Sequence, residues 1–365
     1  MWAMIVKEFR QVRRDRRTLA MMIVLPVLLL VVLGYAASFD VKKITVAVSG
    51  PQAGLAAGLL RGAPFHVTVT APGETKDWAT NQLRDGRVEM AVVTQTGARP
   101  QVLIDGSQLF AARAALAALA GLGRGGTSAG VRTSAAERAA AAGPAALPVT
   151  PTVQVLYNPG LTTSDIMIPG ICGVILVFVG TVITSLGVVR ERQSGTLEQL
   201  AVMPLRPRDV FLGKIAPYFL VAGVDLAIIL AVGVAIFGVP FRGSPAIFAG
   251  GALLFLFVTL GIGILISSVS QNSGQAIQLA MMTLLPQILL SGLIFPVSSM
   301  AAGVRWISYL LPLTYFNQIA RGVMLRAEPI GPLLPAFLFL ALLGAVVVTA
   351  ATLRFRRYLA PASSS

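Results

Sequence analysis

Six long apolar runs are the feature that most restricts the fold of this 365-residue chain. Each run has about 20 residues, which is the length that an α-helix needs to cross the hydrocarbon core of a bilayer. Because 55% of all residues are hydrophobic and only 12% are charged, the composition is that of an integral membrane protein. We therefore predict an α-helical polytopic membrane protein with six transmembrane helices, at Leu19–Phe39, Ile166–Val189, Ile215–Phe237, Ala246–Ile266, Ala276–Val297 and Leu333–Leu353.

Lys and Arg residues predict the orientation of these helices. Six basic residues precede the first run, whereas only two lysines follow it closely. Since cytoplasmic loops carry the excess of basic residues, the N-terminus is predicted to be cytoplasmic. With six spans, the basic stretch Arg190–Lys214 and the C-terminal cluster Arg354–Arg357 then fall on the same side. The net charge of +14 is thus a topology signal with an attraction to anionic lipid, and nucleic acid is not an expected partner.

Residues 1–18 place apolar side chains near one helical face and basic side chains around the rest. This pattern is typical of an amphipathic helix that lies in the cytoplasmic interface of a membrane. The alternative is the charged beginning of a cleaved signal peptide, but the apolar run at residues 19–39 is longer than such a peptide usually has. We therefore predict an interfacial helix at 1–18 and the first transmembrane helix at 19–39.

The stretch 40–165, between the first two runs, has a different pattern. Helix-like stretches separate its earlier short strand-like segments, and this alternation predicts a small α/β domain with a largely parallel sheet. With a cytoplasmic N-terminus, the domain lies outside the cytoplasm. The five strand-like segments are Ile44–Val48, Val67–Val69, Met90–Val93, Val102–Ile104 and Val153–Leu156.

The polar stretch 190–214 joins the second and third runs on the cytoplasmic side. Within it, Thr196–Gln199 has the pattern of a capping box at the start of a helix. Leu197 and Leu200 follow at helical spacing, and Pro204 ends the helix. Because a helix of about two turns is marginal in water unless its apolar stripe packs on something, we expect this stretch to dock on a partner.

The segment 298–332 is neither an ordinary loop nor a clean span. Pro312 interrupts its apolar residues, and helical spacing resumes at Tyr315 and continues to Arg326. A broken amphipathic segment of this kind favours a re-entrant hairpin at the outer face of the membrane. The alternative is a pair of helices that lie in the interface.

Polar side chains within the predicted spans are candidates for a pathway or an interface. Asp225 lies about ten residues past Lys214, and therefore roughly 15 Å into a hydrocarbon core of about 30 Å. Such a carboxylate faces a bundle interior or a wet cavity, where it either joins helices by a hydrogen bond or lines a translocation path. Gln278 and Gln287 are expected near one face of the fifth span, together with Gln275, at a dimer interface or along the path.

Enzymatic and nucleotide-binding sites are not indicated. The chain has one cysteine, Cys172, and one histidine, His66, which exclude a zinc cluster or a His-dependent triad built from this sequence alone. A membrane-embedded enzyme acting on lipid would need convergent carboxylates or histidines, and the spans offer Asp225 alone. The phosphate-binding pattern G-x-x-x-x-G-K-[ST] does not occur in the sequence.

Three groups of residues resemble a known family. Glu191-Arg192, Gly195-Thr196-Leu197-Glu198 and Pro204-Leu205 resemble the signature of type-2 ABC exporter permeases. Leu311-Pro312-Leu313-Thr314-Tyr315 with Arg321-Gly322 resembles the outer segment of that family, and Tyr157-Asn158-Pro159 is also typical of it. The sequence departs from the pattern at Ala327, where a glycine is usual. It also departs at Arg206, the N-cap position before Pro207, where serine would cap the helix better.

This resemblance implies a transport subunit that is not an enzyme and binds no nucleotide, cofactor or metal itself. A separate cytoplasmic ABC ATP-binding subunit would hold ATP and Mg²⁺ and would receive the coupling residues. The resemblance assigns this coupling role to Glu191, Arg192, Gly195, Thr196, Leu197, Glu198, Leu200 and Pro204, and it assigns Pro312, Tyr315 and Arg321 to the outer re-entrant segment.

The implied assembly is a homodimer, or a pair with a similar permease, embedded in the lipid of a bacterial cytoplasmic (inner) membrane. Both termini are expected in the cytoplasm, and a periplasmic adaptor is a further candidate partner. The implied activity is export of a drug-like or lipid-like amphiphile. The alternatives are a membrane sensor or scaffold, whose outer domain binds a ligand, and a membrane-embedded lipid-modifying enzyme.

Overall fold

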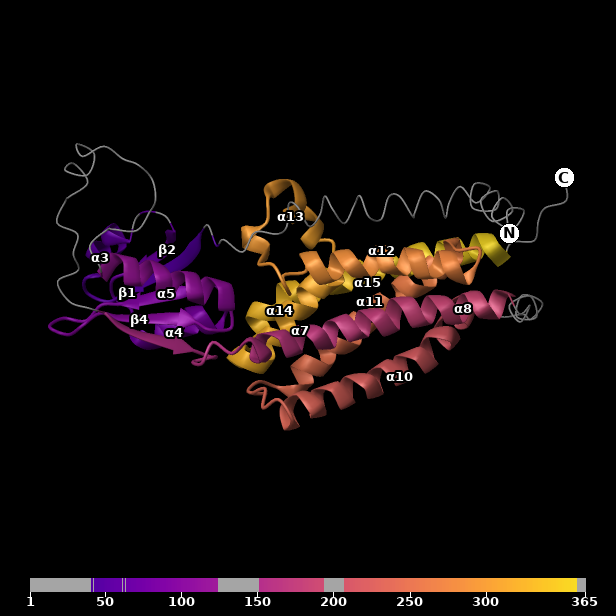
Figure 1. Ribbon diagram of the computed structural model, residues 1–365, viewed down its shortest axis with the longest axis horizontal. Helices are drawn as coiled ribbons and strands as arrows, with labels where there is room; N and C mark the ends of the chain where they lie inside the picture. Colours follow the sequence, from indigo (N-terminus) through magenta and orange to yellow (C-terminus); the bar gives the residue numbers. More distant parts are fainter. Residues whose placement is uncertain are drawn as a thin grey trace, which may run out of the picture.

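The computed structural model describes residues 41–123, except 42, 61 and 63, together with residues 151–193 and 207–359. Figure 1 shows an elongated molecule with an α/β part at one end and a bundle of long helices beside it. The expected interfacial helix at 1–18 and the first expected span at 19–39 lie outside the described residues. So do six of the coupling residues, namely Gly195, Thr196, Leu197, Glu198, Leu200 and Pro204.

The α/β part is built on a five-stranded sheet of order β2-β1-β3-β4-β5. Three of the four strand pairs are parallel, and only β3 and β4 run antiparallel. The strands are Ile44–Ser49 (β1), Phe65–Ala71 (β2), Met90–Val93 (β3), Gln101–Asp105 (β4) and Thr152–Leu156 (β5). The helices between them are Ala53–Leu59 (α3), Lys76–Arg84 (α4) and Leu109–Gly123 (α5).

Both faces of the central strands are apolar, and both are covered. Val46 and Met90 belong to a buried cluster with residues of α3 and α5, whereas Ala47 and Ala91 pack with α4. Successive side chains of a strand point to opposite faces, so neighbouring residues such as Val46 and Ala47 enter different clusters. A sheet with parallel strands needs this cover on both faces.

The helical part begins with one continuous helix, Thr163–Gln193, made of α7 (Thr163–Val177), a π-helical segment η1 (Phe178–Ile183) and α8 (Thr184–Gln193). Four further long helices are α10 (Pro207–Ala235), α11 (Pro245–Val269), α12 (Ser273–Leu290) and α15 (Ile330–Leu359). Two shorter helices, α13 (Ala302–Ser308) and α14 (Pro312–Arg326), lie between α12 and α15 in the chain.

Among the described residues, three helices are long and apolar enough to cross a membrane. They are Thr163–Arg190, Pro245–Val269 and Ile330–Arg354, and Phe219–Ala235 within α10 is a shorter apolar helix. Helix α12 does not reach the same length and hydropathy, since its 18 residues include three glutamines. It also ends at Leu290, seven residues before the predicted end of the fifth span, because Gly292 takes a positive φ of 83° and Pro296 follows.

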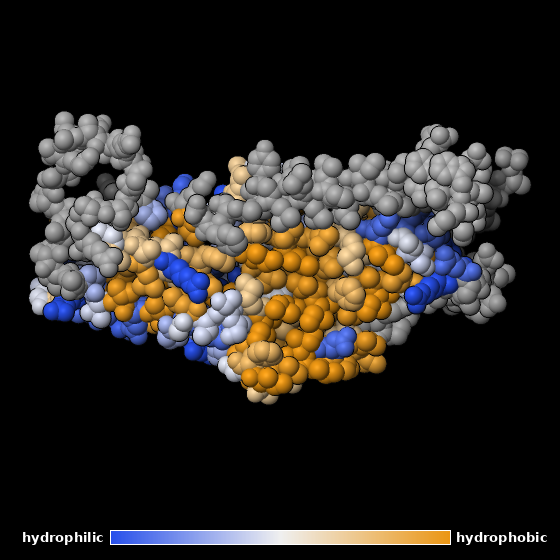
Figure 2. Space-filling view, viewed as in Figure 1, coloured by the Kyte–Doolittle hydropathy of each residue, from blue (hydrophilic) through white to orange (hydrophobic). Residues whose placement is uncertain are grey.

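Helix α11 lies at the centre of the bundle and contacts α7, α8, α10, α12, α14 and α15. Phe248 and Phe255 of α11 are almost fully buried and pack on Phe316 of α14. The rings of Phe255 and Phe316 stack with their centroids 4.5 Å apart. Figure 2 shows that the outside of the bundle is also largely apolar between more polar ends, which is the surface expected of helices surrounded by lipid.

The long helices alternate in direction. Figure 1 shows that α7 starts beside the sheet and that α8 ends at the opposite end of the molecule, while α10 and α12 return towards the sheet. Helices α11 and α15 run away from the sheet. The bundle therefore has an end that meets the α/β part and a far end at which α8 and α11 end and α10 and α12 begin.

Candidate functional site

The far end of the bundle holds the beginning of the predicted coupling stretch. Glu191 and Arg192 lie in the last turn of α8, which is immediately followed by the residues outside the description. The Arg192 guanidinium donates to the backbone carbonyl of Ser270, the residue that caps α11. Next to it, the Ser273 hydroxyl donates to the side-chain oxygen of Gln193 at 3.1 Å. The coupling stretch is thus attached at its start to the α11–α12 connection.

The continuous helix Thr163–Gln193 and α11 also approach each other closely nearer the middle of the bundle. Gly180 in η1 faces Thr259 of α11, and Gly263 of α11 faces the backbone carbonyl of Gly180, with no room for a Cβ atom at either glycine. Small residues of this kind let transmembrane helices pack backbone to backbone. Because a π-helical segment commonly marks a functional position in a helix, η1 is a candidate point at which this helix changes shape.

The predicted polar residues of the spans are not brought together. Asp225 is half-buried on α10, Gln278 is half-buried on α12 and Gln287 is fully buried on α12. The expectation that Gln278 and Gln287 share a face is wrong. Nine residues at about 100° each make about two and a half turns, so the two side chains leave the helix on opposite sides. Gln275 does lie on the buried side, where its side chain accepts a hydrogen bond from the backbone of Gln271 at 2.9 Å.

Buried amides between α12 and α14 form a polar region inside the apolar bundle. Gln287 is 0% exposed, and neither its side-chain oxygen nor its nitrogen has a hydrogen-bond partner among the described residues. Asn317 of α14 donates to the Ser291 hydroxyl at 3.2 Å, but its own side-chain oxygen has no such partner. Since a buried polar atom without a partner costs about 1–3 kcal/mol, these amides mark a place where a role other than stability is expected.

The end of the bundle beside the sheet carries a buried group of charges. Arg326, at the end of α14, is 7% exposed and reaches Asp105 at the end of β4, with 3.5 Å between nitrogen and oxygen. Its second terminal nitrogen lies 2.5 Å from a carboxylate oxygen of Glu328. The nitrogen that faces Asp105 also donates to the Ser107 hydroxyl at 3.3 Å. We call Asp105, Ser107, Arg326 and Glu328 the junction cluster, since it joins the α/β part to the bundle.

Burial and ion pairing act in opposite directions on the pKa values of the junction cluster. Burial raises the pKa of Asp105 and of Glu328 above their ordinary values, while the positive charge of Arg326 acts in the opposite direction on both. Burial acts to lower the pKa of Arg326, but the charges of Asp105 and Glu328 together outweigh it, so that the pKa of Arg326 is raised. Removing one partner would leave a buried charge uncompensated, which costs about 3–5 kcal/mol.

Ala327 makes the geometry of the junction cluster possible. It caps α14 in the left-handed conformation, with φ 52° and ψ 39°, and the backbone N–H of Glu328 then bonds to the Gly322 carbonyl at 3.0 Å. This turn brings the Glu328 carboxylate back to Arg326. The conformation explains why glycine suits this position, because a left-handed residue with a Cβ atom costs roughly 1–2 kcal/mol.

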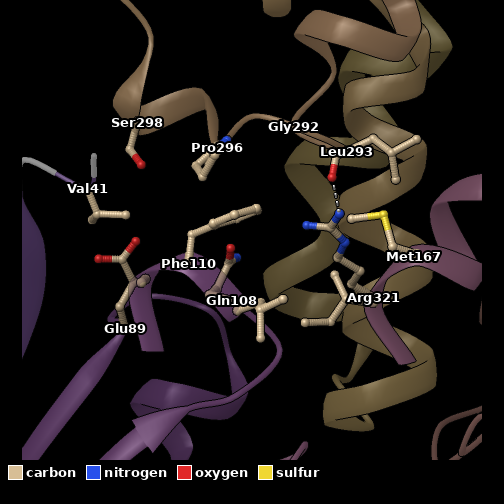
Figure 3. Close-up of a pocket in the computed structure, with 13 residues that line it drawn as sticks. Val41, Glu89, Gln108, Phe110, Met167, Gly292, Leu293, Pro296, Ser298 and Arg321 are labelled. Atoms are coloured by element: carbon tan, nitrogen blue, oxygen red, sulfur yellow. Dashed lines mark hydrogen bonds between the residues drawn. The ribbon is translucent and has the colours of Figure 1, made fainter. Parts of the chain in front are cut away.

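A pocket opens between the α/β part and the bundle (Figure 3). Glu89, Gln108 and Phe110 line it from the α/β part, and Arg321 of α14 lines it from the bundle. Met167 of α7 and the loop after α12, with Leu293 and Pro296, complete the wall. Its empty volume, which includes the open mouth, is about 400 Å³.

The three residues predicted for the outer segment have different surroundings. Arg321 reaches the pocket and donates to the Leu293 carbonyl at 3.4 Å. Tyr315 instead points away, bonding to the carbonyl of Tyr309 at 2.7 Å and stacking on Phe339. Pro312 is the first residue of α14, where its missing N–H is harmless. Only Arg321 is therefore placed to meet a ligand in this pocket.

Sequence reasoning missed the junction cluster, Glu89 and Asn317. Asp105 and Arg326 are far apart in the sequence, and neither carries a motif or a periodicity that points to the other. Glu328 follows Arg326 closely, which is a weak signal of an ion pair, but a charge pair of this kind is usually exposed and of little weight. The pocket has no signal in the sequence, because its wall comes from six separate segments.

Comparison with known proteins identifies the family. Residues 16–353 match the model of the ABC-2 family transporter protein. The chain is 30% identical to the probable multidrug ABC transporter permease YbhS of Escherichia coli (strain K12), over 89% of this chain and 88% of that protein. It is 34% identical to the inner membrane transport permease YhhJ of the same bacterium, over 55% of this chain and 54% of that protein.

A more distant relative is ABC transporter G family member 20 of Dictyostelium discoideum, which is 29% identical over 49% of this chain and 24% of that protein. The chain therefore belongs to the ABC-2 family of transporter proteins, and the resemblance to type-2 ABC permeases is confirmed. It is an integral membrane protein with the role of an ABC transporter permease, and this family implies an ATP-binding partner.

Proposed function

We propose that this chain is the transmembrane subunit of an ATP-driven exporter that moves a drug-like or lipid-like amphiphile across a bacterial cytoplasmic membrane. A separate cytoplasmic subunit binds ATP and Mg²⁺ and hydrolyses the nucleotide, and this chain converts the resulting movement into transport. The family match and the names of relatives such as the multidrug permease YbhS support this proposal.

The proposed topology has six spans and an α/β domain, at 40–165, outside the cytoplasm. The alternating direction of the described helices supports it, because the α/β part and the starts of α7, α11 and α15 share one end of the molecule (Figure 1). Arg190 and Arg192 at the end of α8 and Arg354 near the end of α15 lie at the other end. That end is therefore cytoplasmic by the positive-inside rule, with the first span and the interfacial helix preceding it in the chain.

The coupling stretch 190–214 is the proposed contact with the ATPase. Leu197 and Leu200 supply apolar contact with the ATPase. Glu191 and Glu198 make polar contacts that fix the position of the stretch on the ATPase. In the outer half, α13 and α14 form the proposed re-entrant segment at 298–332, and the burial of α14 against α7, α11 and α15 supports this choice over a helix pair on the surface.

The hydrogen bond from Arg192 to the Ser270 carbonyl is the observation that carries the coupling mechanism. A movement of the coupling stretch passes through Arg192 directly to the end of α11 and the start of α12. Since α11 contacts all the other long helices, a shift at this point reaches the whole bundle. The close packing of Gly180 against α11 keeps the two helices moving together.

A pair of variants tests this mechanism. In Arg192→Gln the link to Ser270 is weakened, and we expect ATPase binding to persist while transport falls by about tenfold, the effect of losing roughly 1.4 kcal/mol of coupling. Arg190→Gln is the control, because Arg190 is exposed on the same helix turn. Both are measured as ATP hydrolysis and amphiphile export in reconstituted vesicles. Equal transport by the two variants would contradict the mechanism.

The proposed assembly is a homodimer or a pair with a similar permease. Exposed apolar side chains along α10 and α15, such as Val224, Ile228, Leu338 and Leu342, offer surfaces for membrane lipid or for a second permease. An adaptor in the periplasm would meet the α/β part. The oligomeric state is measured by cross-linking in the native membrane, and a single permease in the active complex would exclude the dimer.

A further inference from the structure

The pocket between the α/β part and the bundle has walls of opposite charge. Figure 3 shows Glu89 on the side of the α/β part and Arg321 on the side of the bundle, with Gln108 and Phe110 between them. We propose that this pocket binds the head group of a zwitterionic phospholipid-like amphiphile, with its phosphate at Arg321 and its amine at Glu89. This inference names the substrate class and rests on the proposed function.

Arg321 has free capacity for a phosphate. Its guanidinium carries five N–H donors, yet its one hydrogen bond among the described residues is the long contact of 3.4 Å to the Leu293 carbonyl. Its Nε atom is buried without a hydrogen-bond partner there, and no carboxylate of those residues forms an ion pair with it. A phosphate matches the planar fork of a guanidinium and would satisfy these donors.

Glu89 supplies the opposite charge from a fixed position. One of its carboxylate oxygens accepts a hydrogen bond from the backbone N–H of Thr45 at 2.9 Å, which holds the side chain at the start of β3. Burial raises the pKa of Glu89, and an amine of the ligand would oppose that rise by favouring the ionised form. An anion without an amine would meet Arg321 but would leave the charge of Glu89 without an opposite charge.

The remaining wall suits the part of an amphiphile next to its head group. Phe110, Ile166, Met167 and Leu293 give the pocket an apolar lining beside the two charges. The pocket is lined by residues of both the α/β part and the apolar helices, which places it at the depth of lipid head groups under the proposed topology. The enclosed part of the pocket is small, so that only the charged groups of a ligand would enter it, and the rest of the amphiphile would extend through the open mouth along the outside of the bundle.

Binding to the full-length permease in detergent tests the proposal without ATP or the partner ATPase. The probes are a short-chain phosphatidylcholine, a short-chain phosphatidylglycerol and phosphocholine alone, measured by calorimetry. We expect phosphatidylcholine to bind, and Arg321→Gln to weaken it at least tenfold. Arg113→Gln, at an exposed position on α5, is the control. Equal affinities of these two variants would overturn the proposal.

Glu89→Gln tests the contribution of the negative charge separately from that of Arg321. It should weaken phosphatidylcholine binding severalfold and leave phosphatidylglycerol binding unchanged or stronger, whereas Glu74→Gln, at an exposed position, should change neither. Equal binding of phosphocholine alone and phosphatidylcholine would assign the pocket to soluble zwitterions and overturn the lipid assignment. Met167→Trp, which fills the pocket without changing its charge, should abolish binding, and it keeps the test valid if Arg321→Gln fails to fold.

The outcome is independent of the proposed function as a whole. Zwitterion binding without ATP-dependent transport in vesicles would refute export and retain the site. Transport of an amphiphile by a Met167→Trp variant at the normal rate would retain export and refute the pocket as a substrate site.

Discussion

The junction cluster and the α12–α14 interior bury polar side chains in opposite ways. At the junction, Arg326 is held by two carboxylates and a hydroxyl, so that its charge is matched. Between α12 and α14, the Gln287 amide and the Asn317 oxygen have no partner among the described residues. The difference indicates that the junction holds two parts of the molecule in one arrangement, whereas the interior keeps polar groups ready for a different arrangement or for water.

The largest expected effect is at the junction. Arg326→Gln removes the charge that matches Asp105 and Glu328, and we expect it to lower the free energy of unfolding by about 3–5 kcal/mol. The measurement is thermal unfolding of the purified permease in detergent. Arg87→Gln is the control, because the pair of Arg87 and Asp85 is long, at 3.9 Å, and mostly exposed on the Arg87 side. A similar loss in both variants would refute the assigned role of the junction cluster.

The interior should respond with the opposite sign. Gln287→Leu removes an amide that has no partner in the described part of the chain, and we expect it to stabilise the protein by about 1–3 kcal/mol. Transport should fall, because the polar group is then lost from the bundle. Leu284→Met on the same buried face serves as the control and should change stability by less than about 1.5 kcal/mol. A destabilised Gln287→Leu variant would show that the amide is satisfied after all.

Ala327 permits a smaller test of the junction. Ala327→Gly relieves a left-handed alanine and adds chain entropy to the unfolded state, so the net expectation is a gain of about 0.5–1 kcal/mol. The same exchange at Ala341, exposed within α15, should cost about 1 kcal/mol instead. The two midpoints of thermal unfolding should therefore move in opposite directions, and a shift of the same sign would contradict the assigned conformation.

The smallest effect concerns pH. Burial raises the pKa of Glu89 in the folded protein above its value in the unfolded chain, so the folded state binds more protons in this range. Stability should therefore rise as the pH is lowered towards 4.5, the ordinary pKa of a glutamate, and Glu89→Gln should reduce this rise. The measurement is the midpoint of thermal unfolding as a function of pH, compared between the unchanged protein and Glu89→Gln. An identical pH dependence in both proteins would show that Glu89 does not titrate as its burial requires.

Much of the fold is predictable because its signals are local. Alternating strands and helices placed β1 to β5, and the long apolar runs coincide with α7–α8, α10, α11, α12 and α15. The predicted end of the fifth span failed because hydropathy alone does not register that Gly292 adopts a positive φ. The prediction that Gln278 and Gln287 share a face was wrong because a spacing of nine residues does not return to the same side of an α-helix.

The candidate site was predictable only where a motif carried it. Arg192 and Arg321 belong to patterns that resemble the family, and the structure gives each a definite contact. Glu89, Asp105 and Asn317 belong to no pattern. Their positions depend on how the sheet meets the bundle, which is a long-range outcome of packing that no local spacing in the sequence encodes.

The central claim is that this chain transports an amphiphile only together with a separate ATPase. The most direct measurement is export of a fluorescent amphiphile from vesicles that contain the permease with or without its co-purified ATP-binding subunit. The account predicts export that requires both that subunit and ATP, and that is lost when Leu197 and Leu200 are both changed to Asp. Export by the permease alone, or by the complex without ATP, would contradict it.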